Sequence, residues 1–358
     1  MRNRILLLIS ACFYYSGLMP LITWLHRHSS SRLLVVNYHQ ASGKHLKRQL
    51  VYLHRHFRVH FLDAALEELF APSKQKSHEK DRRLPLAVTF DDGYEDNFTY
   101  AYPLARELRL PITIFLISEY IDCGAAFWWQ DRLLCHAQIE LIEFEGCTYH
   151  MHRQEDQKSF AKVVDAQYRL IDEPEARRDF LCSLGQLLSI PNTIIPDVSE
   201  IPASMLTWVQ IQEMQTSKWV RFGGHTLHHL TLSSSAETEE AIQEVVDCRL
   251  LLQTKLGHII RVFAYPHGGI EHIGHKGILA VRQAGYQWAV TTVPGANTSQ
   301  THPYLIRRIS SDSQLHWLIV ALMTSGVWDF LSYLNWLVKR VKYRKILRMM
   351  PLSLSRKG

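Results

Sequence analysis

Two adjacent carboxylates, Asp91 and Asp92, directly follow an apolar run in the segment "LAVTFDDG" (86–93). A short apolar run of this kind is consistent with a buried β-strand. Acidic side chains are rarely buried unless they are paired or bind a cation. We therefore interpret the two acids as a candidate site, in which one carboxylate binds a cation and the other accepts a proton.

A second candidate is the histidine-rich segment "GGHTLHHLTLS" (223–233). His225 and His229 are four residues apart, which predicts two imidazoles on one side of a helical turn. Two neutral imidazoles and one carboxylate suit zinc or a similar divalent ion, with positions left open for water. We predict Asp92, His225 and His229 as metal ligands, and Asp91 as acceptor of a proton from water that the metal activates.

The spacing of the histidines is weak evidence by itself, because the chain has 20 histidines and contains a second pair with the same spacing, His56 and His60. That second pair follows a basic amphipathic run, with no strand before it, and we interpret it as surface. His228 is expected to point away from the metal ligands.

Around these segments, runs typical of strands alternate with runs typical of helices. The strand-like runs are 32–39, 84–92, 111–118, 218–224, 259–266, 286–292 and 305–310. The helical runs are 46–57, 61–71, 98–109, 237–256 and 276–285. Nearly continuous apolar strands that alternate with helices predict a parallel sheet. The fold class expected is α/β, a distorted (β/α)7–8 barrel with a helical insertion at 124–206.

In such a barrel the active site lies at the carboxyl ends of the strands. Polar residues collect at the ends of the predicted strands here: His39 ends the first, and Asp91 and Asp92 end the second. His225 and His267 follow two later strands, and the last strand carries Arg307 and Arg308. These side chains, although far apart in the sequence, are expected to meet at one rim.

The segments "TFDDG" (89–93) and "HTLHH" (225–229) resemble the first two motifs of the polysaccharide deacetylase family, the NodB-homology or family 4 carbohydrate esterases. "FAYPHGG" (263–269) lies where a third motif is expected. The resemblance covers about 84–310 and implies a distorted (β/α) barrel that removes acetyl groups from N-acetylated sugars with a divalent metal. Details of these segments resemble a membrane-associated branch that acts on surface or exported polysaccharide.

By position in the motifs, Asp91 is similar to the family's general base. Asp92, His225 and His229 are similar to its metal ligands. The resemblance also implies that a main-chain N–H near His267, together with the metal, stabilises the oxyanion.

The third motif departs from the family pattern. Ala264 stands where the family has an arginine that steadies the base, and we expect Arg307 or Arg308 to take that role, with Arg308 as our choice. His267 stands where the family more often has tyrosine, and we predict that it is catalytic.

The late histidine that protonates the leaving amine in the family has no clear match. His302 and His316 are the late candidates, and His39 and His267 lie at strand ends.

These expectations together predict a metal-dependent hydrolase that removes N-acetyl groups from amino sugars of a polysaccharide or lipid-linked glycan. The metal expected is Zn²⁺, with Co²⁺ or Mn²⁺ as alternatives. Two other functions stay open: a deformylase or O-deacetylase acting on a lipid-linked sugar, and a degenerate barrel that binds glycan without turnover. The basic residues match no nucleic-acid-binding motif, so no nucleic-acid partner is expected.

The two ends of the chain suggest a membrane surface as a second partner. Residues 5–25 carry no charge, and we expect residues 1–30 to form a membrane anchor or an interfacial helix. Residues 31–312 would form the barrel, and residues 313–358 an amphipathic, basic helical tail. The location predicted is a bacterial inner membrane, where Arg and Lys after the apolar segment favour the cytoplasmic face.

The bulk composition is that of a globular protein, with 47% hydrophobic and 21% charged residues and a formal charge of +6. The six cysteines form no CxxC pair, and we expect them to be free thiols.

Overall fold

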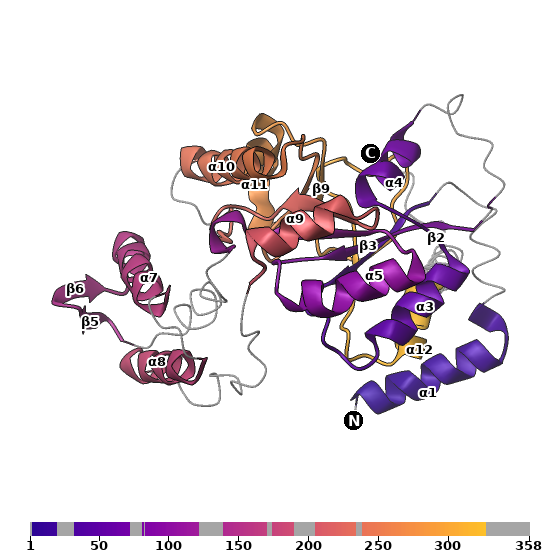
Figure 1. Ribbon diagram of the computed structural model, residues 1–358, viewed down its shortest axis with the longest axis horizontal. Helices are drawn as coiled ribbons and strands as arrows, with labels where there is room; N and C mark the ends of the chain where they lie inside the picture. The colour runs from indigo at the N-terminus through magenta and orange to yellow at the C-terminus, as the bar shows by residue number, and fades with distance from the viewer. Residues whose placement is uncertain are drawn as a thin grey trace, which may run out of the picture.

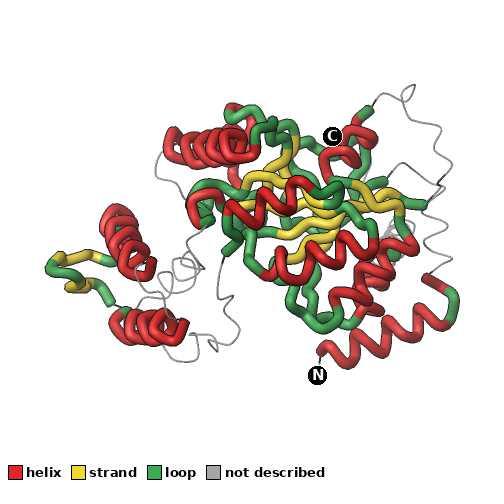
Figure 2. Tube along the Cα trace, in the orientation of Figure 1, coloured by secondary structure: helices red, strands yellow, loops and turns green. Residues whose placement is uncertain are grey.

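The computed structural model describes residues 2–19, 32–71, 81, 83–121, 139–169, 174–189, 205–233 and 238–326. Its centre is a sheet in which every pairing is parallel, surrounded by helices (Figures 1 and 2). The strands of this sheet are β1 (Leu34–Tyr38), β2 (Arg58–His60), β3 (Pro85–Phe90), β4 (Ile112–Leu116), β7 (Val220–Gly224), β8 (Val262–Ala264), β9 (Trp288–Val290) and β10 (Ile309–Ser310). The order across the sheet is β10-β1-β3-β4-β7-β8-β9, and β2 pairs with β3.

The two edges of the sheet approach each other through one segment of chain. β10 pairs with β1, while Ile306, just before β10, forms a parallel bridge to Val290 of β9. The sheet is therefore curled round, and the predicted α/β class with a distorted (β/α) barrel is confirmed.

Helices cover the outside of this sheet. They are α3 (Leu46–His56), α5 (Tyr102–Leu108), α9 (Trp208–Thr216), α10 (Thr238–Leu256), α11 (Ile270–Gln283) and α12 (Trp317–Thr324). A short π-helical turn, η2 (Asn97–Ala101), leads into α5, and a 3₁₀ turn, η3 (Ser118–Tyr120), follows β4. The helix α9 was not predicted, although Thr207 and Gln210 form a capping box at its start, because its sequence has little amphipathic pattern.

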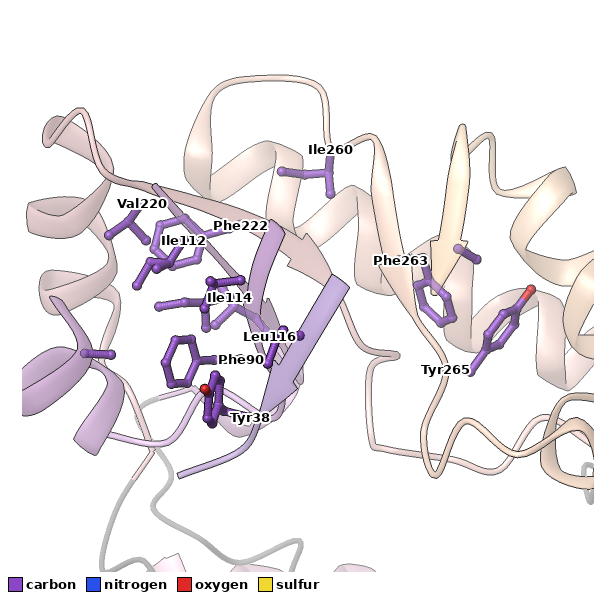
Figure 3. Close-up of a cluster of buried hydrophobic side chains, with 14 of the residues drawn as sticks. Tyr38, Phe90, Ile112, Ile114, Leu116, Val220, Phe222, Ile260, Phe263 and Tyr265 are labelled. Atoms are coloured by element: carbon purple, nitrogen blue, oxygen red, sulfur yellow. The ribbon is translucent and has the colours of Figure 1, made fainter. Parts of the chain in front are cut away.

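Residues of the strands alternate between two buried clusters. Phe90, Ile112 and Ile114 face outward and pack under the helices, together with the stacked ring of Tyr38 (Figure 3). The intervening positions fill the barrel interior, where helix α4 (Leu62–Phe70) packs against them. The inward set comprises Val35, Ala87, Phe115, Val262 and Ala264 of the strands and Leu62, Leu66 and Leu69 of α4. Since Ala87 belongs to the inward set, the alternation of β3 directs Thr89 and the next odd position, Asp91, to the same side.

The predicted insertion at 124–206 is described over 139–169, 174–189 and 205–206. It holds α7 (Gln154–Arg169) and α8 (Pro174–Leu187), and these stand to one side of the barrel in Figure 1. It also contains an antiparallel hairpin, β5 (Leu141–Phe144) and β6 (Cys147–His150), which the sequence analysis did not anticipate. Glu145 and Gly146 connect the two strands with φ of 51° and 73°, as a tight hairpin turn requires.

The N-terminal helix α1 (Arg2–Tyr15) packs against α12. Its 14 residues span about 21 Å at 1.5 Å per residue. Within the ranges that the structure describes, no helix combines the length and the hydropathy needed to cross a bilayer. The remainder of the predicted apolar segment, residues 20–25, and most of the predicted C-terminal tail, residues 327–358, lie outside the described residues.

The glycine pair that ends β7 is required by close packing. A Cβ on Gly223 would lie 2.6 Å from the ring of Phe115 and 2.9 Å from Val262. We predict that Gly223→Ala lowers the free energy of unfolding by about 1–3 kcal/mol, because the ring is enclosed and has nowhere to move. Urea denaturation of the purified chain measures this loss.

Gly277→Ala in helix α11 is the matched control, because a Cβ there would lie 3.3 Å from Cγ2 of Ile273 and from Cβ of Leu232, so these neighbours need to move by only a few tenths of an ångström. Alanine is favoured over glycine in a helix by about 1 kcal/mol, so this variant should lose little stability or gain some. Equal losses in the two variants would contradict the packing argument.

Candidate active site

A buried ion pair joins Asp91 to Arg308 at the carboxyl end of β3. The guanidinium donates from Nη1 to Oδ1 at 2.7 Å and from Nη2 to Oδ2 at 2.8 Å. Both side chains are almost fully enclosed, with exposed fractions of 2% for Asp91 and 0% for Arg308. Burial alone would raise the pKa of Asp91, but the charge and hydrogen bonds of Arg308 outweigh it and lower that pKa below its usual range. Asp91 is therefore ionised at neutral pH.

Arg308 is held in place by groups other than Asp91. Its Nε donates to the carbonyl of Thr291 at 2.7 Å, and Nη1 also donates to Oδ1 of Asn37 at 2.9 Å. Arg307 instead is exposed, as neighbouring residues of extended chain face opposite sides. Of the two arginines that the sequence left open, the structure thus places Arg308 against Asp91.

Three predicted ligand residues converge beside this pair. Within the ranges that the structure describes, Asp92, His225 and His229 form the sole group of three or more potential metal-ligating residues, with ligand atoms all within 4.8 Å of one another. Oδ1 of Asp92 lies 3.2 Å from Nε2 of His225 and 3.6 Å from Nε2 of His229. All three residues are buried. The other spaced pair, His56 and His60, belongs to no such group.

The segment that carries the two histidines is a loop, so the predicted helical turn is wrong. His225 directly follows β7, and both Thr226 and His229 adopt left-handed backbone conformations, with φ of 64° and 59°. Asp92 is left-handed as well, with φ of 72°. Non-glycine residues rarely adopt these angles, and the few that do are concentrated at functional sites. The two imidazoles meet because the loop folds back, and not because of helical periodicity.

Glu244 of helix α10 fixes this loop from outside. Its Oε2 accepts hydrogen bonds from the main-chain N–H groups of Leu227 and His228, at 3.2 and 3.0 Å. Its Oε1 lies 2.7 Å from Nδ1 of His228, whose side chain is thereby turned away from the ligand atoms, as predicted. No sequence pattern singles out Glu244, because its position opposite the loop depends on how α10 packs.

The hydrogen bonds of His225 test whether a cation fits here. Its Nδ1 lies 2.8 Å from the carbonyl of Ala264, which can only accept, so Nδ1 carries the proton. In the neutral ring Nε2 then presents a lone pair to the carboxylate of Asp92. Two facing lone pairs require a cation between them, either a proton or a metal ion, and orientation of a metal-bound histidine by a carbonyl is a common arrangement. The residues present therefore fit a divalent metal.

The charges around Asp92 favour the ionised form of its carboxylate, which is the form that binds a metal. Burial would raise the pKa of Asp92, but when a proton is the cation, the hydrogen bond from His225 and the charges of His39 and His229 lower that pKa well below its usual range. An ionised carboxylate with two imidazoles is a donor set that zinc accepts.

His39, at the end of β1, is the histidine next to the base. Its Nε2 lies 4.0 Å from Oδ2 of Asp91, and its side chain is 51% exposed. The loop after His39 is fixed by two residues of the segment following Asp92. Asp96 accepts hydrogen bonds from the N–H groups of Ala41 and Ser42, and Asn97 donates to the carbonyl of His39.

His267 lies on the other side of the metal-ligating residues. Its ring centre is 5.2 Å from that of His229, and its backbone is left-handed, with φ of 59°. The late histidines instead cap local structure: His302 accepts from the N–H of Tyr304, and His316 accepts from the first turn of α12. The structure thus brings His39 and His267 to the site, whereas the hydrogen bonds of His302 and His316 are local.

Residues 78–289 match the sequence model of the polysaccharide deacetylases, described as "Polysaccharide deacetylase". The chain belongs to the polysaccharide deacetylase family. It is 20% identical over 294 residues to YxkH of Bacillus subtilis (strain 168), whose name assigns it to the same family, with 80% of this chain and 74% of that protein aligned.

Two solved structures share the fold of this family member. IcaB from Ammonifex degensii superposes with a TM-score of 0.52 at 18% identity, covering 83% of this chain and 98% of that one. The Streptococcus pyogenes deacetylase PplD, solved with acetate, gives a TM-score of 0.53 at 15% identity, covering 82% and 99%. At these identities the likeness supports the distorted barrel alone.

The buried Asp91–Arg308 ion pair should make a large contribution to the free energy of unfolding. We predict that Arg308→Met lowers the free energy of unfolding at pH 7 by about 3–5 kcal/mol, because Asp91 is left charged and buried. Arg307→Met is the matched control and should change it by less than about 0.5 kcal/mol. Urea denaturation measures both, and equal effects would contradict the assignment.

The difference in stability between Arg308→Met and wild type should depend on pH. Because the pKa of Asp91 is lowered in the folded protein, its stabilising contribution is present above the unfolded carboxyl pKa of about 4 and is lost as pH falls through the lower folded value. In Arg308→Met the buried carboxyl can instead take up a proton, which removes its unpaired charge. The stability difference from wild type should therefore shrink between pH 7 and pH 3, and a constant difference would contradict the ion-pair explanation.

Glu244 should influence metal binding without touching the metal. We predict that Glu244→Ala weakens the binding of an added divalent metal such as zinc roughly 10-fold, the low end of the effect of groups that orient metal ligands, because the loop between His225 and His229 loses two main-chain hydrogen bonds. Asp247→Ala on the same helix is the control, as that carboxylate accepts a hydrogen bond from Gln243 instead. Competition with a chromophoric chelator gives both affinities, and unchanged zinc binding in Glu244→Ala would rule out the role.

Proposed function

We propose that this chain is a metal-dependent hydrolase that removes N-acetyl groups from amino sugars of a polysaccharide or a lipid-linked glycan. Membership of the polysaccharide deacetylase family supports the class of reaction. The observation that carries the proposal is the convergence of Asp92, His225 and His229 beside the buried Asp91–Arg308 pair. A protein that only binds glycan has no need of an ionised base next to three ligand side chains.

Zn²⁺ is the ion proposed, with Co²⁺ or Mn²⁺ as alternatives, because imidazole and carboxylate accept all three. A divalent ion bound by Asp92, His225 and His229 would polarise the amide carbonyl and lower the pKa of water. The same three side chains leave part of the coordination open, as catalytic sites require.

Asp91 is proposed as the general base. Arg308 keeps it ionised and fixes the plane of its carboxylate through two hydrogen bonds. Each carboxylate oxygen has a second lone pair, so Asp91 can still accept a proton from the attacking water. Arg308 is thereby proposed as the residue that takes the role of the arginine missing at Ala264.

His39 is proposed as the proton donor to the leaving amine. Its Nε2 is 4.0 Å from Oδ2 of Asp91, and half of its side chain is exposed, so substrate can reach it. Histidine is the side chain that most often acts as a general acid near neutral pH. His267 remains the second candidate, and the main-chain N–H beside it is proposed to donate to the oxyanion, as the family resemblance implies.

The deformylase and the O-deacetylase would use the same site residues and would differ in substrate. A deformylase would release formate, and an O-deacetylase would release acetate from an ester but leave the amide intact. The degenerate barrel was suggested by the missing third-motif arginine, and the position of Arg308 weakens that suggestion. A bacterial inner membrane, with the cytoplasmic face favoured, remains part of the proposal, supported by the charges that flank residues 5–25.

The test is product analysis with the full chain loaded with zinc, cobalt or manganese. We expect acetate from a panel of N-acetylated glycans and lipid-linked amino sugars, with free amine formed in equal amount. Formate would favour the deformylase, and acetate without amine would favour the O-deacetylase. Binding of glycans without any product would support the degenerate barrel.

Asp91→Asn separates catalysis from binding. We predict that this variant retains its metal and loses about 10²–10⁴-fold in turnover, because a positioned base contributes that much. His228→Ala is the control and should keep both metal and turnover, since that side chain faces Glu244. Full activity of Asp91→Asn would contradict the proposed mechanism.

A further inference from the structure

Helix α1 has two apolar faces, of which the protein covers one. Leu6, Phe13 and Tyr14 pack against α12, where the ring of Tyr14 lies 5.1 Å from that of Trp317. Ser10 on the same face is fully buried and bonds back to the carbonyl of Leu6. The side of α1 that faces the protein is thus a closed apolar contact.

The opposite face of α1 is a continuous exposed stripe. Ile5, Leu8, Ile9 and Tyr15 have exposed fractions of 55%, 67%, 42% and 77%, and exposed Cys12 lies between them. These positions follow the 3- and 4-residue spacing of one helix face. A helix that lies on the outside of a globular protein normally presents polar residues there, and one that is apolar all round is covered by something.

We propose that this stripe, hereafter the α1 stripe (Ile5, Leu8, Ile9, Cys12 and Tyr15), lies flat in the interface of a bilayer that contains anionic phospholipid. The helix spans about 21 Å, which is too short for a hydrocarbon core of about 30 Å, so it lies in the plane of the membrane. Figure 1 shows α1 along the outside of the molecule, beside α12 and α3, where a flat surface can approach it.

Charge decides between a membrane and a second copy of the chain. The first acidic residue in the sequence is Asp63, and exposed Arg4 on α1 is accompanied by exposed Lys44, Arg48 and Arg55 around helix α3. α3 contacts α12, which in turn contacts α1, so the helix that carries these cations is joined to α1 through α12. Two copies that met through the α1 stripe would oppose these like charges, whereas anionic headgroups would neutralise them.

The first test is alkylation of the full-length wild-type chain, read at each cysteine by mass spectrometry. Cys12 and Cys147 are both exposed, but Cys147 lies in the hairpin β5–β6, far along the chain. Vesicles of phosphatidylcholine with phosphatidylglycerol should slow alkylation of Cys12 at least tenfold and leave Cys147 unchanged. Phosphatidylcholine vesicles alone, or high salt, should protect Cys12 less.

The second test measures flotation with the same vesicles. Leu8→Gln with Ile9→Gln should weaken binding at least tenfold. Val209→Gln with Leu250→Gln is the control, because both of these exposed residues lie on other helices, and it should bind as wild type does.

Several results would overturn the inference. One is flotation of the wild type with no protection of Cys12, which would assign binding to another segment. A second is the absence of flotation of the wild type. A third is unchanged vesicle binding of the Leu8→Gln, Ile9→Gln variant. Protection of Cys12 by protein concentration in the absence of vesicles would identify a second copy as the occupant instead.

Discussion

Two lone pairs held face to face inside a protein need a cation between them, and the site of this member of the polysaccharide deacetylase family depends on that constraint. The carbonyl of Ala264 accepts a hydrogen bond from the protonated Nδ1 of His225, which leaves Nε2 directed at the carboxylate of Asp92. His229 adds a second imidazole from the same folded loop. Beside them, Arg308 supplies the charge that keeps Asp91 ionised without occupying the space between the ligands. The barrel brings the ion pair and the ligands together, because β3 and β7 lie on either side of β4 and their carboxyl ends lie at one rim.

Much of this could be predicted from local sequence. Each apolar run is short and follows or precedes an amphipathic run, so the parallel sheet and the helices α3, α4 and α10 were expected nearly where they lie. Asp91 and Asp92 were identified because acids that end a buried strand need a physical reason. A resemblance to a family and the rule that barrel sites form at strand ends then indicated the three candidate ligands and the pair Arg307 and Arg308.

What could not be predicted depends on tertiary packing. The choice between Arg307 and Arg308 depends on which side of an extended segment faces inward, and that is set by the pairing of β10 with β1. Histidine spacing suggested a helical turn, but left-handed angles at Thr226 and His229 fold the segment as a loop. Glu244 acts across space from another helix, so spacing in the sequence gives no sign of it. The hairpin β5–β6 was missed because two four-residue strands in a charged region leave little apolar pattern.

The most direct measurement of the central claim is anomalous diffraction from crystals of the zinc-loaded chain. The account predicts one strong zinc peak bonded to Asp92 Oδ1, His225 Nε2 and His229 Nε2, with distances of about 2.0–2.2 Å. Asp91 should lie beside the zinc and remain paired with Arg308. A zinc peak elsewhere, or a loaded crystal in which Asp92 and the two imidazoles share no ion, would contradict the account.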